Sequence, residues 1–191
     1  MTSRRPLHHH DPMDSHRTDT LHVRPAQPDD LEAVAALRWQ WVREAGEAPP
    51  VTTRDAFVRR FVAWSRENAS SHRCLVIVRG DVVIGMAWLA VTRRVPSPRA
   101  LERASGDVQC VYVVPHERDG GLGGRLIDAV LELARQQGLE RVTVHSSVRA
   151  VRAYARHGFG TSPLLLQADV PASAARPAAA APPLLPEKDL R

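Results

Sequence analysis

The chain has 191 residues, of which 43% are hydrophobic, and this length and composition fit one folded domain with additional tails. No apolar run approaches the roughly 18 residues of a membrane-spanning helix, and no apolar stretch follows the twin arginine near the start. We therefore predict neither a membrane span nor a signal peptide and expect a cytoplasmic protein. The formal charge is +5, but the arginines are scattered and Lys188 is the only lysine, which argues against nucleic acid as the main partner.

Composition also separates the two ends of the chain from its middle. Residues 1–20 are polar and rich in His, Arg and Asp, which is typical of a disordered arm, and we predict no metal site at their three consecutive histidines. Residues 171–191 hold five prolines and seven alanines, a composition that cannot build a core and that predicts a disordered tail. The folded domain is therefore predicted to span residues 21–170.

Within residues 21–170 the apolar pattern alternates between short strands and amphipathic helices, with turn residues between them. In chain order the predicted elements are a strand over 21–26, helices over 28–46 and 54–69, strands over 74–79 and 82–91 joined by a tight turn at Gly80–Asp81, a strand over 107–114, a helix over 124–138, a strand over 141–146, a helix over 148–158 and a last strand over 162–170. This order, β-α-α-β-β-β-α-β-α-β, predicts an α/β fold in which a central mixed sheet is flanked by helices on both faces.

The most informative stretch is RDGGLGGRL, residues 118–126, which lies between a predicted strand and a predicted helix. It contains four glycines within five positions, namely Gly120, Gly121, Gly123 and Gly124. Glycine lowers the stability of regular structure, so this cluster needs a reason. The first N–H groups of a helix lack internal partners, and a phosphate can bind them where glycines let the backbone come close. We therefore predict an anion site, to which Arg118 adds positive charge.

The spacing within this stretch distinguishes between kinds of phosphate loop. No Gly-Lys pair is present, which excludes a Walker loop, and Leu126 stands where a dinucleotide fingerprint needs its last glycine. The spacing Arg118-x-x-Gly121-x-Gly123 resembles the Q/R-x-x-G-x-G/A pyrophosphate loop of the GNAT superfamily of acyl-CoA-dependent N-acetyltransferases. The Val-Val-Pro sequence before it and the run AVRAYARHGFG at 150–160 also resemble signatures of that family. The structural alternative for the glycines is a tight strand-to-helix turn without a ligand.

The resemblance extends over nearly all of residues 21–170 and implies acetyl-CoA as a cosubstrate, with no metal. It implies that the backbone of Val113 and Val114 pairs with the pantetheine arm and polarises the acyl carbonyl. It also implies a pyrophosphate cradle, which consists of Arg118, Asp119, Gly120, Gly121, Leu122, Gly123 and Gly124. The chain departs from the family at Asp119, whose carboxylate lies near the pyrophosphate. It departs again at Ser147, which together with the preceding serine stands where many relatives carry Asn.

The same resemblance makes Tyr154 the candidate acid that protonates the departing thiolate. A phenol with a pKa of about 10 is mostly protonated at neutral pH and can donate, although a core tyrosine is the structural alternative. The general base stays open at this point. The candidates are Asp107 at the start of a strand, His145 on the next strand, Glu102 in the loop over 96–106, or a chain of water molecules.

These features predict an N-acetyltransferase that moves the acetyl group of acetyl-CoA to a primary amine of a small molecule or a peptide, by direct attack in a ternary complex. The alternative is a non-catalytic acyl-CoA-binding module of the same fold, which acts as a sensor or a scaffold. A homodimer is compatible with either function. The cysteines Cys74 and Cys110 lie in apolar strand-like runs and are expected to be free thiols, and no local signature makes Cys110 a nucleophile.

Overall fold

The computed structural model describes residues 20–46 and 49–170, so the predicted tail and all of the predicted arm except Thr20 lie outside the described residues. The chain divides into two units, Met1–Phe159 and Gly160–Arg191, and each is described by itself. Among the described residues, no helix is both long enough and apolar enough to cross a membrane.

The first unit is built on a five-stranded sheet with the order β1-β2-β3-β4-β5. The strands are β1 (Leu21–Pro25), β2 (His72–Arg79), β3 (Val82–Arg93), β4 (Ala104–Val113) and β5 (Val142–Val144). The helices are α1 (Leu31–Ala45), α2 (Arg54–Glu67), α3 (Leu122–Gln136) and α4 (Val148–Arg156), with short 3₁₀ turns at Pro28–Asp30 and Pro115–Glu117. Strands β1 to β4 pair antiparallel and β5 pairs parallel to β4, so the predicted mixed sheet is confirmed.

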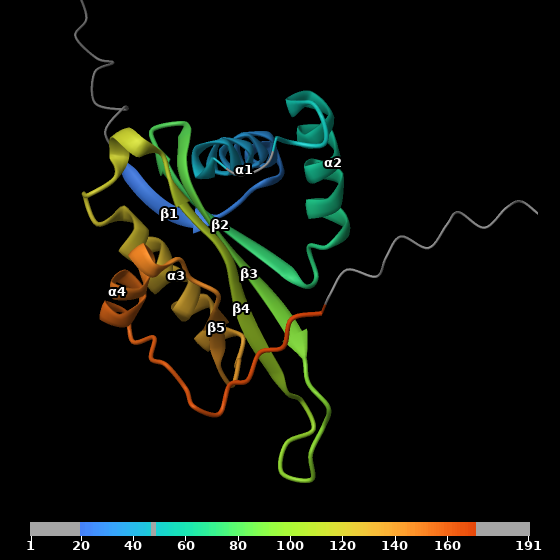
Figure 1. The fold of residues 1–191 in the computed structure, drawn as a ribbon. Helices are drawn as coiled ribbons and strands as arrows, with labels where there is room; N and C mark the ends of the chain where they lie inside the picture. Colours follow the sequence, from blue (N-terminus) through green and yellow to red (C-terminus); the bar gives the residue numbers. More distant parts are fainter. Residues whose placement is uncertain (1–19, 47–48, 171–191) are drawn as a thin grey trace, which may run out of the picture. The chain divides into compact units, whose positions relative to one another are not determined.

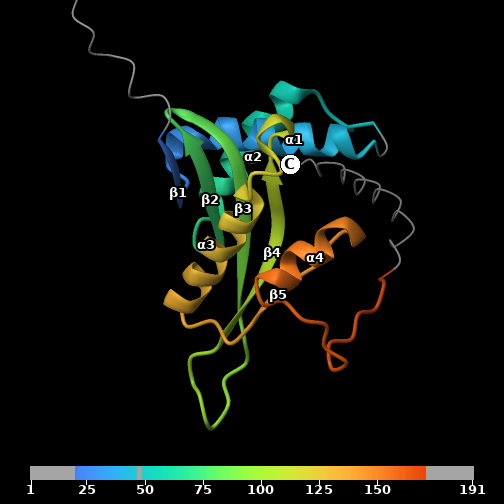
Figure 2. The same ribbon diagram turned by 90° about the vertical axis from the view of Figure 1, so that its left-hand side faces the viewer.

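Helices cover both faces of this sheet, with α1 and α2 on one face and α3 and α4 on the other (Figure 1 and, turned by 90°, Figure 2). Helix α3 packs on β2, β3 and β4 through apolar residues four positions apart, namely Leu122, Leu126, Val130 and Ala134, all of which are buried. A spacing of four places side chains on one helix face, and burying each leucine or valine stabilises the fold by about 1.5–3 kcal/mol. This stripe anchors the helix whose first turn carries the glycine cluster.

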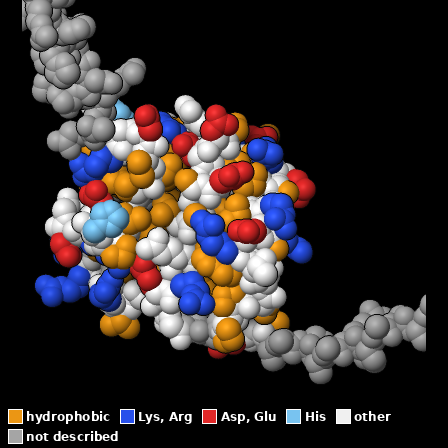
Figure 3. All heavy atoms as spheres, turned by 90° about the horizontal axis from the view of Figure 1, so that it is seen from above, with side chains coloured by type: hydrophobic (Ala, Val, Ile, Leu, Met, Phe, Trp, Pro, Cys, Tyr) orange, Lys and Arg blue, Asp and Glu red, His pale blue; other side chains and the backbone are white. Residues whose placement is uncertain are grey.

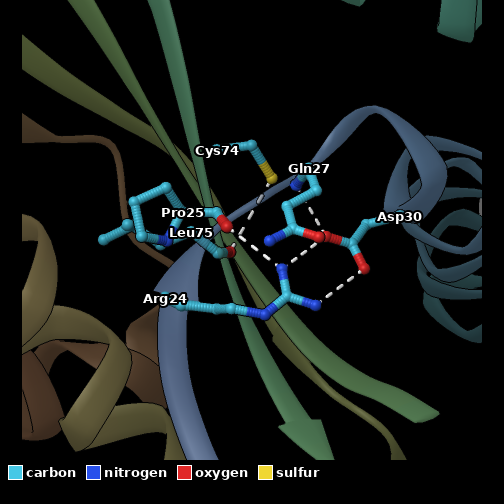
Figure 4. Close-up of polar contacts among 6 residues, drawn as sticks. All are labelled: Arg24, Pro25, Gln27, Asp30, Cys74 and Leu75. Carbon is cyan, nitrogen blue, oxygen red and sulfur yellow. Dashed lines mark hydrogen bonds and ion pairs between the residues drawn. The ribbon is translucent and has the colours of Figure 1, made fainter. Parts of the chain in front are cut away.

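A polar cluster connects β1 to α1 (Figure 4). The Asp30 carboxylate accepts hydrogen bonds from the Arg24 guanidinium, with an Nη2–Oδ1 distance of 3.0 Å, and from the backbone N–H of Gln27 at 2.6 Å. The carboxylate thus fixes the turn that leads into α1, although no side chain caps the helix itself. At the other end, Gly46 follows α1 with a φ of +69°, the left-handed conformation that glycine adopts most readily.

The structure differs from the predicted elements in several places. The described residues of the second unit, 160–170, contain no strand, so the predicted strand over 162–170 is wrong for them. The three leucines of this segment are exposed, namely Leu164, Leu165 and Leu166. An apolar sequence forms a strand only when a neighbouring strand accepts its hydrogen bonds, so apolar composition is not sufficient for a strand. Strand β4 begins three residues earlier than predicted, at Ala104, and α3 begins two residues earlier, at Leu122. The second half of the glycine cluster therefore lies inside the helix.

Candidate active site

A pocket opens where the sheet divides between β4 and β5. Among the described residues β5 pairs with β4 only over Gly106–Val108, so the remainder of β4 lacks a partner strand on that side. The pocket that lies there has a volume of about 370 Å³. Its walls come from the end of α1, from β4 and β5, and from the start and middle of α4.

A β-bulge in β4 sets which backbone groups face this pocket. Trp88 pairs with Cys110 and Leu89 with Val108, so Gln109 is the extra residue, and it lines the pocket. Beyond the bulge, the Val114 N–H donates to the carbonyl of Ile84 at 3.0 Å. Backbone groups alternate in an antiparallel ladder, so those of Val113 point away from β3 and toward the gap beside β5.

Val113 and Val114, the two predicted backbone partners of the pantetheine arm, therefore differ in where their backbone groups form hydrogen bonds. Val113 lines the pocket, and its carbonyl accepts a hydrogen bond of 2.8 Å from Arg118 Nε. Val114 uses its N–H on β3 and its carbonyl on the N–H of Glu117 at 3.0 Å. Val113 is thus the residue whose N–H is directed at the pocket, and Val114 is engaged in holding the end of the strand.

The four clustered glycines differ in backbone conformation and in what a side chain at each position would meet. Gly121 begins α3 with a φ of +77°, which a residue with a side chain rarely adopts. A Cβ added at Gly124 would lie 2.6 Å from Nε2 of His157, so the His157 ring would have to shift to admit a side chain there. A Cβ added at Gly120 or Gly123 would meet nothing within 4 Å. The fold itself does not require glycine at these last two positions, which border open space.

The first N–H groups of α3 have no helical carbonyl to which they can donate a hydrogen bond. The first helical hydrogen bond runs from the N–H of Arg125 to the carbonyl of Gly121 at 3.2 Å, and among the described residues no side chain caps the helix. The amides of Leu122, Gly123 and Gly124 precede that bond, so they fit an anion. Asp119, just before them, has a φ of +67° and is the only described non-glycine residue with a positive φ. Such a backbone conformation is uncommon and tends to occur at functional loops.

Arg118 reaches from the glycine loop toward the pocket rather than over the loop. Its Nη2 donates to Glu44 Oε2 at 2.7 Å, and its guanidinium carbon lies 5.2 Å from the centre of the Tyr112 ring. The Tyr112 hydroxyl donates to Glu44 Oε1 at 2.7 Å. Glu44 lines the pocket from the last turn of α1, and no sequence motif pointed to it.

The Glu44 carboxylate is held in its ionised form. Burial raises the pKa of this group, but hydrogen bonds from Arg118, Tyr112 and Gln40 outweigh that effect and lower the pKa below its usual value. The pKa of Tyr112 is raised in turn, first by burial and then by the Glu44 carboxylate, which accepts a hydrogen bond from the Tyr112 hydroxyl and is negatively charged. At neutral pH the pocket therefore contains a carboxylate beside a protonated phenol.

Tyr154 lines the same pocket from α4, and only 8% of its surface is exposed. Its ring packs edge-on against Phe159, with the ring centres 5.2 Å apart. A hydrogen bond between His157 Nδ1 and Asp128 Oδ1 ties the end of α4 to α3 and so fixes the helix that carries Tyr154. Burial raises the pKa of the Tyr154 hydroxyl, so the phenol keeps its proton at neutral pH, as a general acid requires.

The candidate bases do not all lie together. His145 lines the pocket, as does Ser147, which directly precedes α4. Asp107 is absent from the pocket walls and accepts a hydrogen bond of 3.1 Å from the Thr143 hydroxyl. The Glu102 side chain is 91% exposed and pairs with an arginine of β3. The structure therefore brings His145 together with Tyr154 and leaves both carboxylate candidates outside.

The cysteines and the surface give no sign of another chemistry. Both cysteines are free thiols as predicted, and burial raises the pKa of Cys110, which makes its thiolate scarce. Among the described residues no group of three or more His, Cys, Asp or Glu could hold a metal ion. On the face seen in Figure 3, basic, acidic and hydrophobic side chains are interspersed rather than sorted into one basic field.

Comparison with known proteins identifies the family to which the chain belongs. The sequence model of the Acetyltransferase (GNAT) family matches residues 33–159, and the chain belongs to that family. A mycothiol acetyltransferase from Propionibacterium freudenreichii subsp. shermanii is 26% identical over 172 residues, covering 87% of this chain and 50% of the relative. The chain thus spans about half the length of that relative. The "uncharacterized N-acetyltransferase YhfO" of Bacillus subtilis is 27% identical over 142 residues, which cover 73% of this chain and 89% of the relative.

Solved structures agree on the fold. The structure of a "predicted acetyltransferase with acetyl-CoA" from Clostridium acetobutylicum aligns with a TM-score of 0.64 at 17% identity, and the alignment covers 78% of this chain and 96% of that chain. This likeness confirms the predicted fold class, a mixed sheet with helices on both faces.

Proposed function

We propose that the protein is an N-acetyltransferase that moves the acetyl group of acetyl-CoA to a primary amine of a small molecule or a peptide, by direct attack in a ternary complex. One observation carries the proposal, namely that the uncapped start of α3 and the pocket with Tyr154 lie at the same end of β4. Membership of the GNAT family supports the reaction class, and the acetyl-CoA named with the Clostridium structure supports the choice of donor.

The residues at this end of β4 fit acetyl-CoA. Open space at Gly120 and Gly123 and the free amides of the first turn fit its pyrophosphate. The Val113 N–H and the Tyr154 hydroxyl, in the adjoining pocket, fit its thioester end. When bound there, acetyl-CoA supplies an acyl carbon that an amine can attack.

Each step of the proposed reaction has a residue in the pocket. The Val113 N–H donates to the acyl oxygen and stabilises the negative charge that grows on it as the carbon–nitrogen bond forms. Tyr154 donates its proton to the sulfur as the carbon–sulfur bond breaks. An ammonium acceptor gives up two protons in all, of which one leaves through His145 to solvent and the other replaces the proton lost by Tyr154. We assign the first transfer to His145 because it lines the pocket and Asp107 does not.

The test is thiol release from acetyl-CoA with a panel of primary amines, with the product identified by mass spectrometry. Release is expected only when an accepted amine is present, and the product is expected to carry one acetyl group. Calorimetric binding of acetyl-CoA without an acetylated product from a broad panel would instead support the non-catalytic acyl-CoA-binding module.

A further inference from the structure

The environment of Glu44 suggests what kind of acceptor the pocket takes, if the proposed acetyltransferase activity holds. Among the described residues that line the pocket, Glu44 is the only one with a carboxylate, whereas Arg118, His145 and Arg149 are basic. Its side chain is 31% exposed, so the carboxylate stands at the wall of the pocket with one side open to an incoming molecule.

The hydrogen bonds to this carboxylate leave room for one more donor. Oε1 accepts from the Tyr112 hydroxyl at 2.7 Å and from Gln40 Nε2 at 2.9 Å, while Oε2 accepts from Arg118 at 2.7 Å. An ionised carboxylate has about four lone-pair directions. Three donors therefore fix the group in place, and Oε2 keeps the capacity to accept another hydrogen bond.

Arg118 also sets the distance between this carboxylate and the reacting end of β4. One guanidinium donates through Nε to the Val113 carbonyl at 2.8 Å and through Nη2 to Glu44 at 2.7 Å. Glu44 Oε2 and Val113 are therefore separated by no more than a guanidinium and two hydrogen bonds. An ammonium bound to Oε2 is therefore on the same wall of the pocket as Val113, the residue whose N–H we assign to the acyl oxygen.

We propose that Glu44 binds the ammonium form of the acceptor through Oε2, and that Arg118 and Tyr112 are positioning residues for that carboxylate. The acceptor class is then a primary amine that is cationic in solution. Placing such a cation in a partly dehydrated pocket is costly without an anionic partner, and Glu44 supplies one. Glu44 is not assigned as the base, because a carboxylate that binds three donors holds a proton weakly.

The test compares Glu44→Gln with the wild type on two acceptors. One acceptor is the alkylamine that the panel identifies, and the other is its analogue with three fluorines on the carbon β to the nitrogen, which is neutral at the assay pH. Loss of a charged hydrogen bond is expected to raise KM for the cationic amine by about 10- to 100-fold. The KM for the neutral analogue and the dissociation constant of acetyl-CoA are expected to change less than about twofold.

Two further variants separate binding from structure. Glu44→Asp keeps the charge and is expected to recover part of the lost affinity for the cationic amine. Glu32→Gln removes a carboxylate from the exposed first turn of the same helix, outside the pocket, and is expected to behave as the wild type. Equal loss with both amines, or a matching loss of acetyl-CoA affinity, would mean that Glu44 only supports the Arg118 loop, and would overturn the inference.

The inference can fail separately from the proposed function. If the wild type acetylates amines and Glu44→Gln does so with unchanged KM, the inference is wrong and the function stands. If the wild type acetylates none, the function fails, and an NMR titration of the CoA complex with ethylammonium chloride decides on Glu44. Binding that Glu44→Gln abolishes would support the inference, and binding that it leaves intact, or no binding by the wild type, would refute it.

Discussion

Alanine and aspartate at Gly123 are expected to have different effects on folding stability and on acetyl-CoA binding. A Cβ at this position meets nothing within 4 Å, and α3 already includes the residue, so Gly123→Ala creates no clash within the protein. Alanine is favoured over glycine in a helix by roughly 0.5–1 kcal/mol, which corresponds to a rise in Tm of roughly 1–4 °C for a chain of this size. Alanine is also accepted at this position of the Q/R-x-x-G-x-G/A loop, so the acetyl-CoA affinity of Gly123→Ala is expected to change little.

Differential scanning calorimetry measures the first effect and isothermal titration calorimetry the second. Gly123→Asp extends the series, because its carboxylate repels phosphates and is expected to abolish binding with the fold retained. Gly124→Ala is the matched comparison, since its Cβ would lie 2.6 Å from His157 and disturbs the contact of α3 with α4 instead. Unchanged acetyl-CoA affinity in Gly123→Asp would refute the assignment of the loop, and a fall in the Tm of Gly123→Ala would show that the position is not open.

Three other changes have defined outcomes. Tyr154→Phe is expected to slow acetyl transfer by roughly 10²–10⁴-fold, toward the low end because a thiolate can leave unaided, with the loss in kcat rather than in acetyl-CoA affinity; turnover at the wild-type rate would make Tyr154 a packing residue. Asp30→Asn removes the partner of Arg24 and is expected to cost roughly 1–2 kcal/mol at pH 7. The hydrogen bond from Arg24 holds the pKa of Asp30 below its usual value, so this stability is present above pH about 4 and is lost as the pH falls; a Tm difference that persists at pH 2 would contradict this. Removing residues 1–19 and 172–191 is expected to leave Tm and acetyl-CoA affinity nearly unchanged, because their compositions cannot bury much apolar surface, and a drop of many degrees would show that a tail packs on the domain.

Local patterns in the sequence were sufficient to predict most of the helices and strands. The stripe of apolar residues on α3, the glycine after α1 and the turn at Gly80–Asp81 each act over a few residues, so their structural effect could be predicted. Element ends were harder to predict. Gly123 was predicted to lie outside the helix because glycine has a low helix propensity, yet the buried stripe that begins at Leu122 holds it in the first turn.

The parts of the site that the sequence could not predict depend on distant contacts. Glu44 is bound by Tyr112 and Arg118, which are 68 and 74 residues away in the chain, and a spacing of that length forms no recognisable motif. The bulge at Gln109 shifts the register of β4 by one residue, which alternation of side chains alone does not reveal. The segment 162–170 shows the reverse case, in which a strand-like composition lacks the partner that a strand needs.

The most direct test of the central claim is a crystal structure of the protein with acetyl-CoA. We expect the pyrophosphate to lie on the amides of Leu122, Gly123 and Gly124, and the thioester to lie in the pocket within hydrogen-bond reach of the Val113 N–H and the Tyr154 hydroxyl. Electron density for the pyrophosphate away from the start of α3, or for the thioester outside the pocket between β4 and β5, would contradict this account.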